Sequence, residues 1–157
     1  MWALSHVVVL FCLALPPSGA PTDAVQLRLF HEQAMRAHRE SNIDLLLEHD
    51  AADFVLASRG EISHPSLEER RARLGSYLQR TKFTEYRDVV EPVVTVSKDG
   101  TLGWVVAQIH AQGVQSSLAD KKEPVEFDSA WIELYQKREG KWCSIGNVSN
   151  FKEEAKR

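Results

Sequence analysis

The stretch FDSAWIELYQKREGKWCSIGNVSNF, residues 127–151, decides the fold. It holds two runs rich in β-branched and aromatic residues, which are typical of strands, joined by a turn at Glu139-Gly140. A long hairpin is therefore expected here. Asp128 is a carboxylate among residues that otherwise look buried, and either a pocket or a solvated strand end explains it.

Two more long strands are expected upstream, over residues 83–97 and 101–113. The turn between them contains Asp99-Gly100, a strong hairpin signal. Pro92 cannot donate to a strand ladder, so it indicates an edge position or a bulge in the first of these strands. Together the strands predict a bent antiparallel sheet.

The amino-terminal half is expected to be helical. Apolar residues recur at helical spacing over 23–40, and a short second helix is expected after Ser41 or Asn42. Residues 53–63 are expected to form a strand, a turn and a short second strand that runs back along the first. Ser66 and Glu69 form a capping box that begins a third helix ending near residue 80. Three helices beside one sheet give an α+β layer arrangement.

Composition indicates one globular domain, since 157 residues are 43% hydrophobic and 26% charged, with a formal net charge of −3. The basic residues do not follow an aromatic-studded face, so nucleic-acid binding is not expected.

Residues 1–20 are expected to be a signal peptide, because an apolar run over 7–15 is too short to span a bilayer and is followed by small residues. Cleavage as late as Ala24 is an alternative, and a buried amino-terminal strand is another. The mature domain, 21–157, would then be exported to the periplasm or the outside, with no membrane attachment. Cys143 would be its one cysteine, so no internal disulfide is expected.

The element order, the run RESNIDLLLEHDAADFVLASRGEIS at 39–63 and the closing hairpin resemble the nuclear transport factor 2-like superfamily, in particular its SnoaL-like and ketosteroid-isomerase-like branches. The resemblance covers about residues 23–151. It implies a cone-shaped, cystatin-like α+β roll, in which a strongly curved antiparallel sheet packs against three helices around an apolar cavity. It implies no single function, because the superfamily holds both enzymes and non-catalytic modules.

Strand alternation sorts the residues of such a cone into an inner and an outer face. We expect the bulky aromatic residues on the outer face, where they would form a homodimer, and Asp128 on the inner face. The expected dimer residues are Phe127, Trp131, Tyr135 and Trp104. The expected ligand-binding residues are Asp128, Asn147, Ile145, Ser149, Ala107, Ile109, Ala130 and Ile132. Reversed parity would instead place Trp131 and His110 inside and Asp128 outside.

Asp128 in an apolar cone would have a raised pKa and could serve as an acid or as a hydrogen-bond donor to an oxyanion. The resemblance implies a Tyr and an Asp base at positions that hold Ala34 and Ser58 here, so the ketosteroid isomerase reaction is not expected. His64, in the loop before the third helix, could replace the base, or could be a loop histidine without a catalytic role.

No metal or other cofactor is expected, because His31 and His38 lie seven residues apart and no zinc motif is present. The favoured interpretation is an exported domain that binds a small apolar or amphipathic molecule. The alternatives are a lyase or isomerase that uses Asp128 and His64, and a non-catalytic dimerisation or assembly module.

Overall fold

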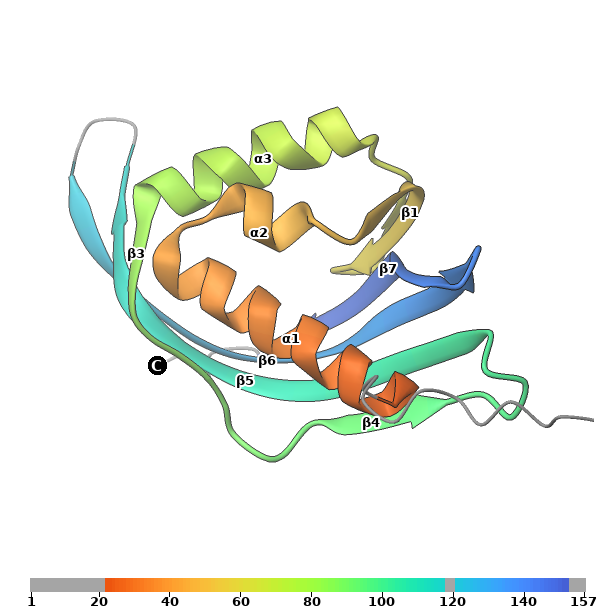
Figure 1. Ribbon diagram of the computed structural model, residues 1–157. Helices are drawn as coiled ribbons and strands as arrows, with labels where there is room; N and C mark the ends of the chain where they lie inside the picture. Colours follow the sequence, from red (N-terminus) through yellow and green to blue (C-terminus); the bar gives the residue numbers. More distant parts are fainter. Residues whose placement is uncertain (1–21, 118–120, 153–157) are drawn as a thin grey trace, which may run out of the picture.

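The computed structural model describes residues 22–117 and 121–152, and in these ranges three helices cover one face of a curved sheet (Figure 1). The helices are α1 (Asp23–Glu40), α2 (Ile43–Leu47) and α3 (Leu67–Arg80). The strands are β1 (Asp50–Ser58), β2 (Glu61–Ser63), β3 (Thr81–Asp88), β4 (Val93–Val96), β5 (Leu102–Ser116), β6 (Lys122–Arg138) and β7 (Lys141–Phe151). The expected α+β cone is confirmed. The expected signal peptide lies outside the described residues.

The strand order in the sheet is β2-β1-β7-β6-β5-β3, and β4 also pairs with β5. All pairs are antiparallel except β1 with β7, so the sheet is mixed rather than purely antiparallel. The strand expected over 83–97 is two strands, β3 and β4, which lie along the same edge of β5 and are separated by a segment containing Pro92. Pro92 therefore lies in the break between two edge strands rather than at an edge position or a bulge within one strand, since proline cannot supply a ladder donor.

Polar caps fix where the helices begin. The side chains of Thr22 and Asn42 accept backbone N–H bonds at the starts of α1 and α2, and Ser66 with Glu69 forms a complete capping box on α3. The buried side of α3 begins with Arg70, which is 1% exposed, and not with the apolar Leu67, which is 39% exposed.

The core lies between α1 and the inner face of the sheet. One cluster joins Leu27 to Val105, Tyr135 and Trp142, and a second joins Met35 to Tyr86, Ile109 and Ala111. The alternation of β5 explains both clusters, because its odd-numbered residues from 105 to 111 are buried and point to α1.

Candidate functional site

A buried charged group, His31 of α1, lies at the centre of the cone. Its side chain is 1% exposed, Nδ1 is 2.8 Å from Glu133 Oε1, and Nε2 is 3.0 Å from Asp88 Oδ1. The Glu133 carboxylate also accepts hydrogen bonds from Trp131 Nε1 at 2.9 Å and from the Tyr135 hydroxyl at 2.8 Å. These five residues are called the His31 cluster below.

The arrangement fixes the protonation state of His31. Both ring nitrogens face carboxylates, which can only accept when ionised, so both nitrogens carry protons and the ring is an imidazolium. Burial lowers the pKa of His31, but the hydrogen bonds and negative charges of Glu133 and Asp88 outweigh it, and the net pKa is raised above 6.5. The cluster is therefore a buried ion network in which every charged group has a partner.

The His31 cluster also settles which face of β6 points into the cone. Trp131, Glu133 and Tyr135 face α1, so the expectation that Trp131 and Tyr135 lie on the outer face is wrong. Phe127 lies on the same inner face, packed against the core. The physical reason is that Trp131 and Tyr135 each carry a polar atom, and the buried Glu133 carboxylate satisfies both atoms.

Asp128 lies on the outer face of the sheet, so the expectation that it points into the cone is also wrong. It pairs across the ladder with His110, and its Oδ1 lies 2.9 Å from His110 Nδ1. Lys152 Nζ lies 3.7 Å from its other oxygen. The hydrogen bond from His110 lowers the pKa of Asp128, opposite to the rise expected in an apolar cavity. The alternative of reversed parity is thus correct for Trp131 and Asp128 and wrong for His110, which lies on the outer face beside Asp128.

The other expected ligand-binding residues divide between the two faces. Ala107 and Ile109 are buried on the inner face, where Asn147 and Ser149 also lie as ladder partners of Glu133 and Trp131. Ala130 and Ile132 are on the outer face with Asp128. Ile145 sits at an irregularity in the β6–β7 pairing, between the partners of Leu134 and Tyr135.

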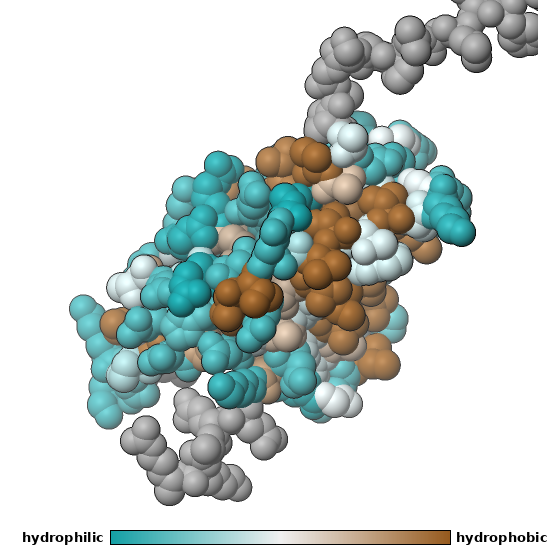
Figure 2. All heavy atoms as spheres, turned by 90° about the horizontal axis from the view of Figure 1, so that it is seen from below, coloured by the Kyte–Doolittle hydropathy of each residue, from teal (hydrophilic) through white to brown (hydrophobic). Residues whose placement is uncertain are grey.

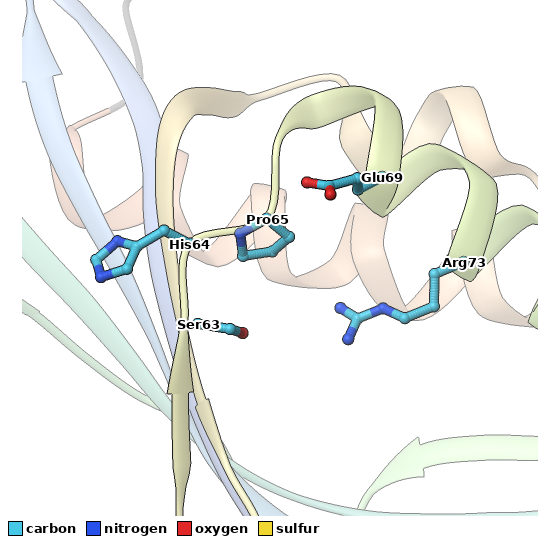
Figure 3. Close-up of a pocket in the computed structure, with 5 residues that line it drawn as sticks. All are labelled: Ser63, His64, Pro65, Glu69 and Arg73. Atoms are coloured by element: carbon cyan, nitrogen blue, oxygen red, sulfur yellow. The ribbon is translucent and has the colours of Figure 1, made fainter.

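His64 lines a surface hollow of about 370 Å³ at the start of α3, with Ser63, Pro65, Glu69 and Arg73. Figure 3 shows the imidazole pointing away from Glu69 and Arg73. Asp128 is not among the residues that line this hollow, and its ionic partners are His110 and Lys152. The structure therefore does not bring together the expected acid and base.

A second buried cation, Arg70, lies under α3. Its Nη2 donates to the Ala51 carbonyl at 2.9 Å, its Nε lies 3.4 Å from Asp50 Oδ2, and its Cζ stacks 4.2 Å from the Phe54 ring centre. Burial raises the pKa of Asp50 to about 6, although the charge of Arg70 and a hydrogen bond from Ser144 act in the opposite direction.

The outer sheet face carries a row of apolar residues across four strands. Val93, Val106, Ile132 and Val148 are successive ladder partners, and this row is called the outer apolar stripe below. Val93, Val106 and Val148 are 60%, 38% and 43% exposed. Trp104 and Leu134 form the adjacent row. Seen from the side opposite the helices, apolar side chains gather in one patch (Figure 2).

No group of three or more His, Cys, Asp or Glu side chains in residues 22–117 and 121–152 could hold a metal ion. Within the same ranges, no helix is long and apolar enough to span a membrane.

Sequence reasoning missed His31, Glu133 and Arg70. His31 could have been found, because it occupies the apolar stripe of the first helix, where a histidine needs a buried partner. Glu133 gave a similar signal, as a carboxylate between Trp131 and Tyr135. Arg70 gave none, since it belongs to a run of charged residues that looks like a solvated helix face.

No family model matches the chain, and no curated protein matches it. Several solved structures do match the chain. An NTF2-like protein from Cytophaga hutchinsonii is 13% identical with a TM-score of 0.63, over 84% of this chain and 99% of that one. A ketosteroid isomerase-like protein from Erwinia carotovora atroseptica is 14% identical with a TM-score of 0.61, over 85% of this chain and 98% of that one.

A third match, from Xanthomonas campestris, carries the name of a calcium/calmodulin dependent protein kinase II association domain. It is 19% identical with a TM-score of 0.60, over 90% of this chain and 95% of that one. At these identities the matches establish the fold, which is the nuclear transport factor 2-like fold expected from the sequence.

Proposed function

We propose that this chain, which has the nuclear transport factor 2-like fold, works as a non-catalytic homodimer that associates through its outer sheet face. The observation that carries the proposal is the outer apolar stripe, a continuous row of valine and isoleucine on the face that no helix covers. Contiguous exposed apolar patches on soluble domains are typical of interfaces. Trp104 is the one residue of the expected dimer set that lies on this face.

The charges on the outer side of β6 are arranged so that a second copy of the same chain can complement them. Along β6 the outer side chains run from acidic Glu126 and Asp128, through Ala130, Ile132 and Leu134, to Gln136 and basic Arg138. In a two-fold interface each copy presents the same patch to the other in opposite orientation. A two-fold axis that crosses β6 at a right angle near Ile132 would bring the acidic end of one β6 strand toward the basic end of its partner, where Arg138 is also paired with Asp53 of its own chain.

The expected acid and base, Asp128 and His64, do not share a site, and this supports a non-catalytic role. Asp128 is paired on the outer face, and every polar group of the His31 cluster already has a partner. One of the chain's fold neighbours is named as an association domain, which agrees with an assembly role.

Native mass spectrometry of Val106→Glu tests the dimer. A charge at the centre of the stripe has to be desolvated on association, so the variant is expected to be monomeric while the wild type is dimeric. Val114→Glu is a matched control, because Val114 lies on the outer face of the same strand outside the stripe and is 40% exposed. A Val106→Glu variant that still has the mass of a dimer would contradict the proposed interface.

A second candidate function is the binding of a small apolar or amphipathic molecule in the cone. Phe83, Phe127 and Trp131 are only partly buried on the inner face, and Phe151, in contact with Phe127, is 38% exposed. Aromatic side chains are common in the lining of small-molecule sites. Detection of a co-purified compound by gentle mass spectrometry, lost in Phe127→Ala and kept in Val114→Ala, would support this function.

Export belongs to the proposal as well, on the strength of the apolar run at 7–15. Cleavage after Ala20 fits the fold better than cleavage after Ala24, which would remove the cap of α1 at Thr22 and the Asp23 carboxylate that binds Lys137 and Trp142. The mass of the secreted protein distinguishes the two cleavage sites.

A further inference from the structure

A second hollow lies where α1 passes the edge strand β3, and it is called the α1–β3 hollow below. Its volume is about 180 Å³, and it is distinct from the hollow at His64 and from the outer apolar stripe. Pockets for drug-sized ligands are larger, so this hollow suits a molecule of only a few non-hydrogen atoms. The residues that line it are Glu32, Met35 and Arg39 of α1 and Arg87 and Asp88 of β3.

Two of the charged side chains at the α1–β3 hollow are held in place from within the protein. The Asp88 carboxylate accepts a hydrogen bond at 3.0 Å from Nε2 of His31, whose own side chain is 1% exposed. Arg39 Nη1 donates to the Tyr86 carbonyl at 2.8 Å, on the free edge of β3. Because these contacts fix the two charges before a ligand arrives, binding orders fewer side chains and costs less conformational entropy.

Charges of both signs line the hollow without neutralising each other. Among the described residues, neither arginine at the hollow forms an ion pair with either of its two carboxylates. Arg87 pairs instead with Glu85, and Asp88 pairs with His31. A guanidinium has five N–H donors and a carboxylate has about four lone-pair sites, so these single contacts leave both charges able to bind a ligand.

Met35 adds an apolar surface to the hollow. It is 3% exposed, it packs with Tyr86 and Ile109 in the core, and it is the one uncharged residue of the lining. The flexible thioether of methionine adapts its shape to small apolar groups. A ligand that complements the whole lining therefore carries a cationic group, an anionic group and a short apolar part.

We propose that the α1–β3 hollow binds a small zwitterion, namely an α-amino acid with a short apolar side chain. Its ammonium group pairs with Asp88 and Glu32, its carboxylate pairs with Arg39 and Arg87, and its side chain lies against Met35. An anion or a cation alone would meet a like charge in the same hollow, whereas a zwitterion places each charge against an opposite one. The site does not depend on the proposed homodimer, because it lies outside the outer apolar stripe.

The experiment is an NMR titration of the purified protein with L-alanine, followed through the methyl signal of Met35 and the backbone amide signal of Asp88. The chain has 2 methionines, so the Met35 methyl signal is readily assigned. Propionate and ethylammonium, which are L-alanine without its ammonium or its carboxylate group, are the reference ligands at neutral pH and equal ionic strength. The amide of Val106 reports any binding at the outer apolar stripe.

Two pairs of variants separate the α1–β3 hollow from the rest of the helix. Arg39→Gln and Glu32→Gln each remove one charge from the hollow. Arg36→Gln and Glu40→Gln are the matched controls, because they remove the same charges from α1 outside the lining. All four residues are exposed, so the variants are expected to fold.

The expected result is a saturable shift of both signals with L-alanine, larger than with either reference ligand, and no shift at Val106. The affinity should fall at least about tenfold in Arg39→Gln and in Glu32→Gln, because each loses a hydrogen bond to a charged group, and should stay within about twofold in the controls. The absence of a saturable shift at Met35 and Asp88, an equal response to either reference ligand, or unchanged affinity in either hollow variant would overturn the proposal.

Discussion

His31 Nδ1 lies 2.8 Å from Glu133 Oε1, and this buried charge pair joins α1 to β6, the longest of the described strands. The pair lies at the centre of the cone, where most domains of this size place aliphatic side chains. Removing one partner of a buried ion pair leaves the other charge without compensation, which costs more than the pair contributes to stability.

Glu133→Ala is therefore expected to lower the free energy of unfolding by about 3–5 kcal/mol, because His31, Trp131 and Tyr135 all lose their shared acceptor. Urea denaturation measures the loss. Glu126→Ala, on the exposed outer side of the same strand, is the control and should change stability by less than about 0.5 kcal/mol. A small effect of Glu133→Ala would mean that the cluster does not hold the core together.

The pH dependence of stability follows from the raised pKa of His31. The folded state binds this proton more tightly than the unfolded state, so the stabilisation is fully present below the unfolded pKa of about 6.5 and is lost as pH rises through the folded pKa. The free energy of unfolding should thus fall on raising the pH from about 6 to about 9. His31→Gln should flatten this dependence, and an unchanged slope would argue against a protonated His31.

Two glycines are expected to respond in opposite directions to alanine. Gly75 lies inside α3, where a Cβ would meet only Ile43 Cγ1 at 3.9 Å, so Gly75→Ala should stabilise the domain by up to about 1 kcal/mol. At Gly113 a Cβ would lie 2.2 Å from the Lys82 carbonyl oxygen, so Gly113→Ala should destabilise by about 1–3 kcal/mol or shift β3 from β5. Melting temperatures of the two variants check the pair, and a stable Gly113→Ala variant would contradict the close β3–β5 approach.

The elements of the fold were largely predictable because their signals are local. Capping by Thr22 and Ser66 and the turns at Glu139-Gly140 and Asp99-Gly100 depend on neighbouring residues alone. The parallel pairing of β1 with β7 was not predicted, since nothing local joins strands so far apart in the sequence.

The site was less predictable, because strand alternation gives two faces but does not say which one is inside. On β6 both faces carry apolar side chains, Ile132 and Leu134 on one and Trp131 and Tyr135 on the other, so size alone favoured the wrong assignment. The deciding contact is between Glu133 and His31, which belong to elements at opposite ends of the chain. An error of one residue in the assumed alternation assigns every side chain of a strand to the wrong face. For this reason Asp128 was predicted inside the cone, whereas it lies on the outer face.

Sedimentation equilibrium of the purified wild-type protein over a range of concentrations tests the central claim most directly. Association through the outer apolar stripe predicts a mass about twice that of the single chain, falling to the single-chain mass in Val106→Glu but not in Val114→Glu. A wild-type mass equal to one chain at every concentration would contradict the homodimer.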